Sequence, residues 1–150
     1  MKAIKHFELF LAEGIVKKQL PNRSRAEFLA KEAEKGCNAL LESVKKIGIT
    51  EDNANTYVKN CYDIIMETIR AKMLLDGFNA SGYGAHEAEV AYLRNLGFSE
   101  SNVQFLDQIR FFRNGMLYYG TIIDKEYAEK VYEFLGKIYP KLLSEINKNS

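Results

Sequence analysis

The stretch "YVKNCYDIIMETIRAKM" (Tyr57–Met73) decides the fold. Its apolar residues recur three and four positions apart, which is the spacing of one apolar helix face. Few polar residues interrupt that face, so several neighbouring helices must cover it. We therefore expect a central helix that is capped by Thr50 and ended by Gly77. Its predicted buried residues are Tyr57, Cys61, Ile64, Ile65, Thr68, Ile69, Lys72 and Met73.

Helical spacing continues through the rest of the chain, without an alternating strand pattern longer than a few residues. Cap and turn residues divide it into further helices, with a connecting loop over Phe78 to Glu87. The predicted helices are Lys2 to about Lys18; Ser24, in a capping box with Glu27, to about Ile47 before Gly48; Ala85 to Leu96 before Gly97; a helix capped by Ser99; and Asp124 to about Asn147, kinked or broken at Pro140.

The fold class that follows is all-α. A chain of 150 residues suits a single domain, so residues 1–150 are expected to form one antiparallel up-and-down bundle of four long helices and one or two short ones. Hydrophobic residues make up 47% of the chain, which argues against disorder, and the net charge of +1 gives no reason to expect tight binding to a nucleic-acid duplex.

The sequence also indicates a cytoplasmic protein. No apolar run approaches the roughly 18 residues that a membrane span needs. Glu8 and Glu13 interrupt the first apolar stretch, so it does not resemble a secretion signal. Cys37 and Cys61 lie in apolar segments, which is typical of free buried thiols in a reducing compartment.

A group of polar residues stands out in "RFFRNGMLYYG" (Arg110–Gly120). On an ideal helix Arg110, Asn114 and Tyr118 form one line, and Arg113 lies between that line and the apolar stripe. The fork of donors on an arginine suits a phosphate, so Arg110, Arg113 and Asn114 are candidates for binding a nucleotide or phosphate.

A structural role is the alternative for these side chains. Arg113 would then pair with a carboxylate such as Asp63 or Glu67 on the central helix. Gly115 lies inside the predicted helix, where glycine is unfavourable, and indicates a close approach by another backbone.

Metal and cofactor sites are not expected. The two histidines, His6 and His86, lack the glutamate three residues earlier that the di-iron bundle motif requires, and the cysteines have no zinc spacing. His86 stands beside Glu87 and Glu89, which predicts a polar contact at the start of that helix.

Taken together, the segments "RFFRNGMLYYG", "YDIIMETIRAKMLLDGF" and "GAHEAEVAYLRNLGF" resemble the HEPN domain superfamily, and in particular its small stand-alone prokaryotic members. The resemblance covers nearly the whole chain. It implies an up-and-down helical bundle that forms a homodimer through the Arg110–Gly120 helix.

Two functions follow from the resemblance. Many HEPN proteins are metal-independent RNases whose motif begins with an arginine and a polar residue and ends in a histidine several residues later. Here Arg113 and Asn114 match the start, and Tyr118 occupies the histidine position. A phenol with a pKa near 10 is a poor general base at neutral pH. Other members pair with a minimal nucleotidyltransferase antitoxin that modifies a tyrosine, and Gly120 occupies that position, next to Tyr118 and Tyr119.

The favoured hypothesis is therefore a binding module for a nucleotide, an RNA or a nucleotidyltransferase partner in a toxin–antitoxin-type pair. The second hypothesis is a divergent RNase that uses Arg113, Asn114 and Tyr118. The sequence does not decide whether the chain is an enzyme.

Overall fold

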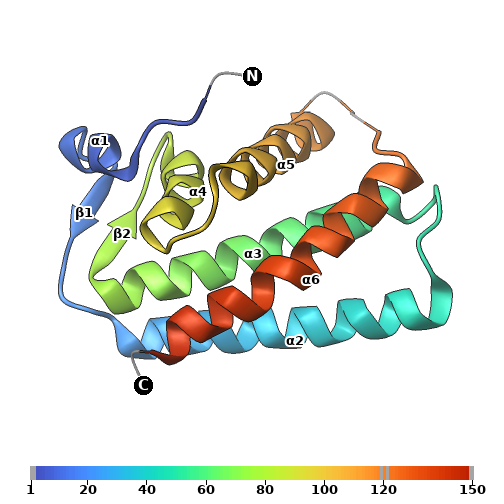
Figure 1. The fold of residues 1–150 in the computed structure, drawn as a ribbon, viewed down its shortest axis with the longest axis horizontal. Coiled ribbons are helices and arrows are strands. Elements are labelled where there is room, and N and C mark those ends of the chain that lie inside the picture. Colours follow the sequence, from blue (N-terminus) through green and yellow to red (C-terminus); the bar gives the residue numbers. More distant parts are fainter. Residues whose placement is uncertain (1–2, 119, 121, 149–150) are drawn as a thin grey trace.

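The computed structural model describes residues 3–118, 120 and 122–148, with the backbone alone for 116–118. The described chain is an all-α bundle of six helices with a small two-stranded sheet (Figure 1). The elements are α1 (Phe7–Ala12), β1 (Val16–Lys18), α2 (Arg23–Ile47), α3 (Ala54–Asp76), β2 (Phe78–Ala80), α4 (Ala85–Asn95), α5 (Glu100–Tyr118) and α6 (Lys125–Asn147).

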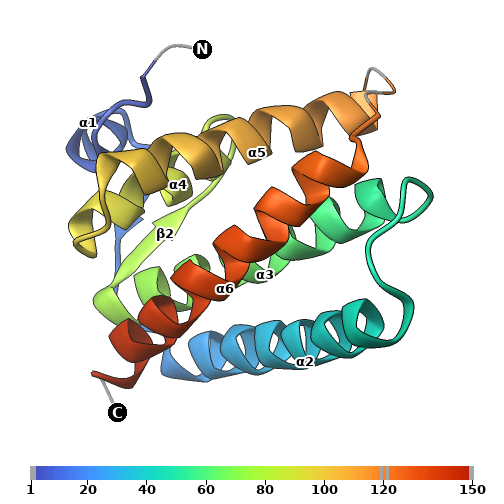
Figure 2. The same cartoon turned by 45° about the vertical axis from the view of Figure 1, so that its right-hand side comes forward.

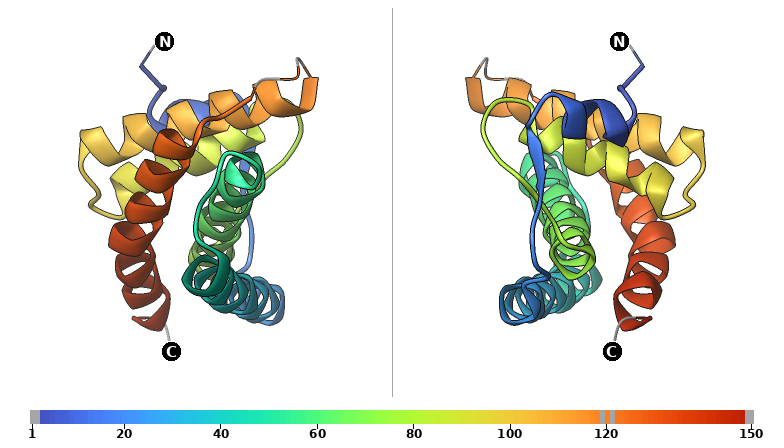
Figure 3. Two further views of the ribbon diagram at one scale, coloured as in Figure 1. Left: turned by 90° about the vertical axis from the view of Figure 1, so that its right-hand side faces the viewer. Right: turned by 90° about the vertical axis from the view of Figure 1, so that its left-hand side faces the viewer.

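Helix α3 is the centre of the bundle, as its sequence predicts. It contacts α2, α4, α5, α6 and β2. Seen end-on, α2 lies on one side of α3, α4 and α5 lie on the opposite side, and α6 runs alongside (Figure 3). Every one of the eight residues predicted to be buried on this helix is buried.

The long helices α2, α3, α5 and α6 run in alternating directions, and α1 and α4 are the short ones (Figures 1 and 2). This confirms the predicted antiparallel bundle within the described residues. None of the described helices is long and apolar enough to cross a membrane.

The predicted first helix from Lys2 to Lys18 is wrong. Helix α1 ends at Ala12, and Gly14 turns the backbone at a φ of 78°. The next residues form β1, which pairs antiparallel with β2 so that Val16 faces Ala80. A strand forms here instead of the predicted helix because Ile15 and Val16 are β-branched. Val16 is 2% exposed, so pairing with β2 buries it in the core.

The same pairing corrects the predicted loop over Phe78 to Glu87, which begins with β2. The ring of Phe78 packs edge-on against Phe7, with centroids 5.2 Å apart, and both rings contact Tyr92. This aromatic cluster attaches β2 and α1 to α4.

Two predicted caps are also wrong. Helix α2 is capped by Asn22, whose side chain accepts a hydrogen bond from the backbone of Arg25, rather than by Ser24. Helix α3 begins after Asn53 rather than after Thr50. The side chains of Thr50 and Asn53 bond reciprocally to each other's backbone N–H groups, so the turn over Glu51 and Asp52 is satisfied before the helix starts.

The other helix boundaries agree with the sequence. Ser99 accepts a hydrogen bond at the start of α5, and Asp124 does so at the start of α6. Helix α6 continues through Pro140, so the predicted break does not occur. Buried Ile138 and Leu142 on either side of the proline hold the two halves of the helix against the core.

Gly77 joins the end of α3 to β2. It adopts a φ of 86°, and a Cβ built there would lie 2.7 Å from the backbone oxygen of Gln19. Gly97 has a similar φ of 84°, but a Cβ there would meet nothing within 4 Å.

Replacing Gly77 should therefore destabilise the protein more than replacing Gly97. The variant Gly97→Ala carries only the left-handed backbone penalty of about 1–2 kcal/mol. The variant Gly77→Ala adds the clash with Gln19 to that penalty. Urea unfolding measures both, and equal losses of unfolding free energy would contradict the close contact.

Candidate functional site

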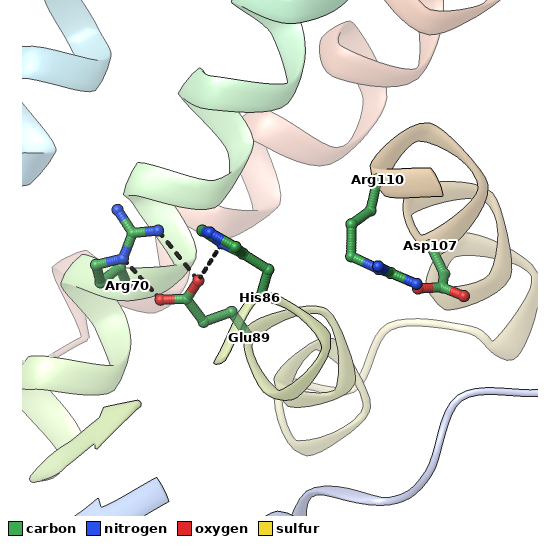
Figure 4. A network of polar contacts seen from close by, with 5 residues as sticks. All are labelled: Arg70, His86, Glu89, Asp107 and Arg110. Carbon is green, nitrogen blue, oxygen red and sulfur yellow. Dashed lines mark hydrogen bonds and ion pairs between the residues drawn. The ribbon is translucent and has the colours of Figure 1, made fainter. Parts of the chain in front are cut away.

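Charged side chains from three helices meet at the junction of α3, α4 and α5, which we call the charged seam. Asp63 and His86 are exposed, but the buried members need partners, because an unpaired buried charge is strongly unfavourable. Figure 4 shows two of its groups, one on each side of α4. The charged seam consists of Asp63 and Arg70 from α3, His86 and Glu89 from α4, and Asp107, Arg110 and Arg113 from α5.

Glu89 is the most buried acid of the charged seam, at 2% exposure. Its two oxygens accept from Nε and Nη2 of Arg70 at 2.6 and 3.0 Å, and Nδ1 of His86 lies 3.2 Å away (Figure 4). Burial alone would raise the pKa of Glu89, but the hydrogen bonds with His86 and Arg70 hold it below its ordinary value. The carboxylate therefore stays ionised and ties α3 to α4.

His86 makes the polar contact that its neighbours in the sequence predict. Its imidazole is bound on one side by Glu89, while 63% of the side chain is exposed. A carboxylate on Nδ1 fixes the ring and favours a proton there, which leaves Nε2 as the basic nitrogen facing away from Glu89.

Arg110 is already paired within the charged seam. Its Nε donates to Asp107 at 2.7 Å, and its Nη1 lies 3.9 Å from Glu87. Asp107 is 3% exposed, so this pair also lies in the interior. Arg110 therefore serves α5 as the counter-charge of a buried acid, and its fork is not free for a phosphate in this conformation.

Arg113 differs from Arg110. Its Nε and Nη1 are buried and have no hydrogen-bond partner among the residues that the structure describes. Neither Asp63 nor Glu67 forms an ion pair with it, although both were candidates from the sequence, and no other described carboxylate lies within ion-pair distance. Burial raises the pKa of Asp63, and Arg113 is the charge that opposes that rise most strongly. Arg113 is thus near Asp63 without being satisfied by it.

Tyr62 lies within the electrostatic influence of both arginines. Its side chain is 6% exposed, and burial raises its pKa. The charges of Arg110 and Arg113 both lower that pKa, while Glu89 and Asp63 raise it further. Arg110 and Arg113 thus both act electrostatically on Tyr62, and a shared binding site for them stays a prediction.

The remaining candidates of the α5 motif have other outcomes. Asn114 is exposed to solvent. The side chain of Tyr118 and the whole of Tyr119 lie outside the described residues. The close approach of another backbone at Gly115 stays a prediction.

Arg70 and Asp107 were not found from the sequence, and Glu89 was named only as a possible polar contact of His86. A usable signal was present for two of them. Glu89 interrupts the apolar run of α4, and Asp107 lies three residues before Arg110, where an ion pair on one helix face is favourable. Charged residues are seldom fully buried unless they are paired, so both positions indicate interior partners.

An acidic groove borders the charged seam between α2 and α3, with a volume of about 310 Å³. Asp63 and Glu67 line it. Burial raises the pKa of Glu67, and the nearby charge of Asp63 adds to that rise. Among the described residues, no three histidine, cysteine, aspartate or glutamate side chains gather as a metal ion would require.

Comparisons with known proteins add no relative: no protein-family model, no curated protein and no solved structure matches the chain.

Removing the buried charge of Glu89 should destabilise the fold. The variant Glu89→Gln leaves Arg70 without its counter-charge, and breaking a buried pair costs about 3 kcal/mol. The matched variant Glu42→Gln loses only an exposed pair with Lys46 and should change stability by less than about 0.5 kcal/mol. Urea unfolding at neutral pH compares them, and similar stabilities would contradict the account of Glu89.

Neutralising Asp63, in contrast, should not lower the stability of the fold. Its pKa in the folded chain is raised by burial, so the folded state carries a penalty that is fully present above that pKa and disappears as the pH falls towards the unfolded value. The variant Asp63→Asn should therefore be at least as stable as the wild type at pH 7, with the advantage vanishing near pH 4. Thermal unfolding across that range measures it, and a loss of stability at pH 7 would show that Asp63 is held by Arg113.

Proposed function

We propose that the chain is a HEPN-like module that binds the phosphate of a nucleotide or an RNA through Arg113. The observation that carries this proposal is the unsatisfied state of Arg113 in a molecule that pairs its other inward arginines. Arg70 has Glu89, Arg110 has Asp107, and Arg94 holds Glu100 through two bonds of 2.8 and 2.7 Å.

The energetics favour a ligand at Arg113. A buried donor without a partner loses its hydration without compensation, at about 1–3 kcal/mol per group. A phosphate accepts several hydrogen bonds from a guanidinium and supplies the missing charge. Arg113 is also the motif arginine of the HEPN-like segment, which supports the same assignment from the sequence.

Arg110 and Asn114 have secondary roles in this proposal. Arg110 holds α5 in place through Asp107 and contributes positive potential near Tyr62. Asn114 is exposed one residue beyond Arg113, where it can contact the sugar of a bound nucleotide.

The partner of the module belongs to the same proposal. Phe111 is 54% exposed on α5, although it is a large apolar side chain. An exposed apolar residue on the Arg110–Gly120 helix suits a homodimer through that helix, or the docking of a minimal nucleotidyltransferase. Sedimentation velocity of wild type and Phe111→Ser decides between the two, because only a homodimer dissociates in the purified protein.

A divergent metal-independent RNase is the second candidate, and His86 is the observation that favours it. Arg113 and His86 both lower the pKa of Asp63, so both side chains lie near the same carboxylate. An imidazole that Glu89 orients offers a nitrogen base, whereas the phenol of Tyr118 is a poor general base.

Binding should depend on Arg113 and not on an exposed arginine elsewhere. Fluorescence anisotropy with a labelled single-stranded RNA, and calorimetry with AMP, measure the affinity. We expect Arg113→Ala to weaken binding about tenfold or more, which corresponds to about 1.4 kcal/mol, and Arg25→Ala to leave it unchanged. If wild type does not bind, or if both variants weaken equally, Arg113 is not the phosphate ligand.

The RNase candidate is tested by metal-free cleavage of the same RNA. If the chain is an RNase, Arg113→Ala abolishes cleavage. A loss in His86→Ala with activity retained in Tyr118→Phe assigns the base to His86, and the reverse assigns it to Tyr118. Absence of cleavage by folded wild-type protein at high concentration would exclude this candidate and leave the binding module.

A further inference from the structure

A second cavity lies between α2 and α6, away from the charged seam. Its volume is about 320 Å³, within the size range of sites for small organic molecules. The walls are largely apolar: Cys37 and Leu41 come from α2, and Tyr132 and Tyr139 come from α6. Neither helix contributes a residue to the charged seam, so this cavity is independent of the proposed function.

Tyr139 brings an unsatisfied polar group to this cavity. Its hydroxyl oxygen is buried, and it has no hydrogen-bond partner in the part of the chain that the structure describes. A phenylalanine would fill the same space without leaving a polar group buried and unpaired, which is unfavourable. The tyrosine therefore points to a partner that the described chain does not supply.

A residue of the opposite wall lies near this hydroxyl. Cys37 is among the groups that raise the pKa of Tyr139, after burial itself, so the thiol and the phenol are close to each other. Both residues line the cavity, and no hydrogen bond joins the phenol to the thiol. The unsatisfied hydroxyl is therefore next to the space that a bound molecule would occupy.

The surroundings of the hydroxyl restrict the kind of ligand. Burial raises the pKa of Tyr139 to about 12, so the phenol keeps its proton at neutral pH and can donate it in a hydrogen bond. The largely apolar walls disfavour a charged ligand. Glu34 acts on Tyr139 and Glu133 lines the cavity, so their negative charges disfavour an anion further.

We propose that this cavity binds an uncharged, largely apolar molecule whose carbonyl accepts a hydrogen bond from the hydroxyl of Tyr139. The apolar body of the molecule covers Leu41, which is 46% exposed in the free protein although it is a large apolar side chain. The carbonyl supplies the acceptor that the phenol lacks.

Benzophenone and 1,1-diphenylethene are a matched pair of probes. Both carry the same rings on a planar central carbon, but a CH2 group replaces the carbonyl oxygen in the second. Equilibrium dialysis measures the affinity of each. We expect saturable binding of benzophenone and about tenfold weaker binding of 1,1-diphenylethene, which is the loss expected for one hydrogen bond. The infrared carbonyl stretch of bound benzophenone should move to the lower frequency of a hydrogen-bonded ketone.

The variant Tyr139→Phe removes only the hydroxyl. It should bind both probes equally, with the affinity that the wild type has for 1,1-diphenylethene. Without a probe it should be at least as stable to urea as the wild type, because an unsatisfied buried hydroxyl is lost. The variant Tyr83→Phe removes a hydroxyl from a side chain that is 98% exposed, and it serves as the matched control with both affinities unchanged.

The variant Gly136→Leu tests the location. Gly136 lines the cavity, and a Cβ built there would meet nothing within 4 Å, so a leucine side chain has room to enter the space. Leucine favours a helix more than glycine does, so the variant should remain folded, which circular dichroism checks. It should bind both probes much more weakly than the wild type.

The proposal is overturned if the wild type shows no saturable binding of benzophenone. Equal affinities of the wild type for both probes, or a preference that survives in Tyr139→Phe, overturn it too, because the hydroxyl is then not the donor. Unchanged binding by Gly136→Leu would place the probes elsewhere, and a wild-type dimer that dissociates in Gly136→Leu would assign the cavity to a second copy of the chain. Either of these results also overturns the proposal.

Discussion

The ion pair between Glu89 and Arg70 is the interaction on which the arrangement of the helices around the site depends. Helix α3 is covered on several sides, so a charge that faces a neighbouring helix must find its partner there. Glu89 is 2% exposed and accepts two hydrogen bonds from Arg70 and one from His86. Because hydration is lost on both partners, the pair specifies how α4 lies on α3 more than it adds to stability.

Arg113 stands out against this background of paired charges. The neighbouring Arg110 shows how the same helix satisfies an interior arginine, with Asp107 one turn away on the same face. No equivalent acid accompanies Arg113, and Asp63 is near it without a direct ion pair. Two buried donor atoms of Arg113 lack a partner among the described residues, which is the physical basis for the proposed phosphate-binding role.

Much of the fold could be predicted from helical periodicity. Tyr57 to Met73 forms an apolar face that only a central helix can bury, and the structure places it there. The pairing of β1 with β2 could not be predicted, because Val16 to Lys18 is too short for a strand pattern and pairs with residues 60 to 64 positions away. Local spacing reports the helix face, whereas strand pairing depends on contacts between distant segments.

The site was only partly predictable for a similar reason. Arg110 and Arg113 were identified from their spacing on one helix, and both lower the pKa of Tyr62. The pairing of Arg70 with Glu89 crosses from α3 to α4, so no spacing within one helix reveals it. Arg110 is paired within α5 by Asp107, whereas the partner of Arg70 comes from a different helix.

The most direct test of the central claim is to observe the Nε–H signals of the arginines by nuclear magnetic resonance while AMP is added. Each signal is assigned by the variant that removes it. The account predicts a saturable shift of the Arg113 signal, with the signals of Arg70 and Arg94 almost unchanged because their carboxylates hold them. An unchanged Arg113 signal, or equal shifts in all three, would contradict the claim that Arg113 is the arginine left free for a phosphate.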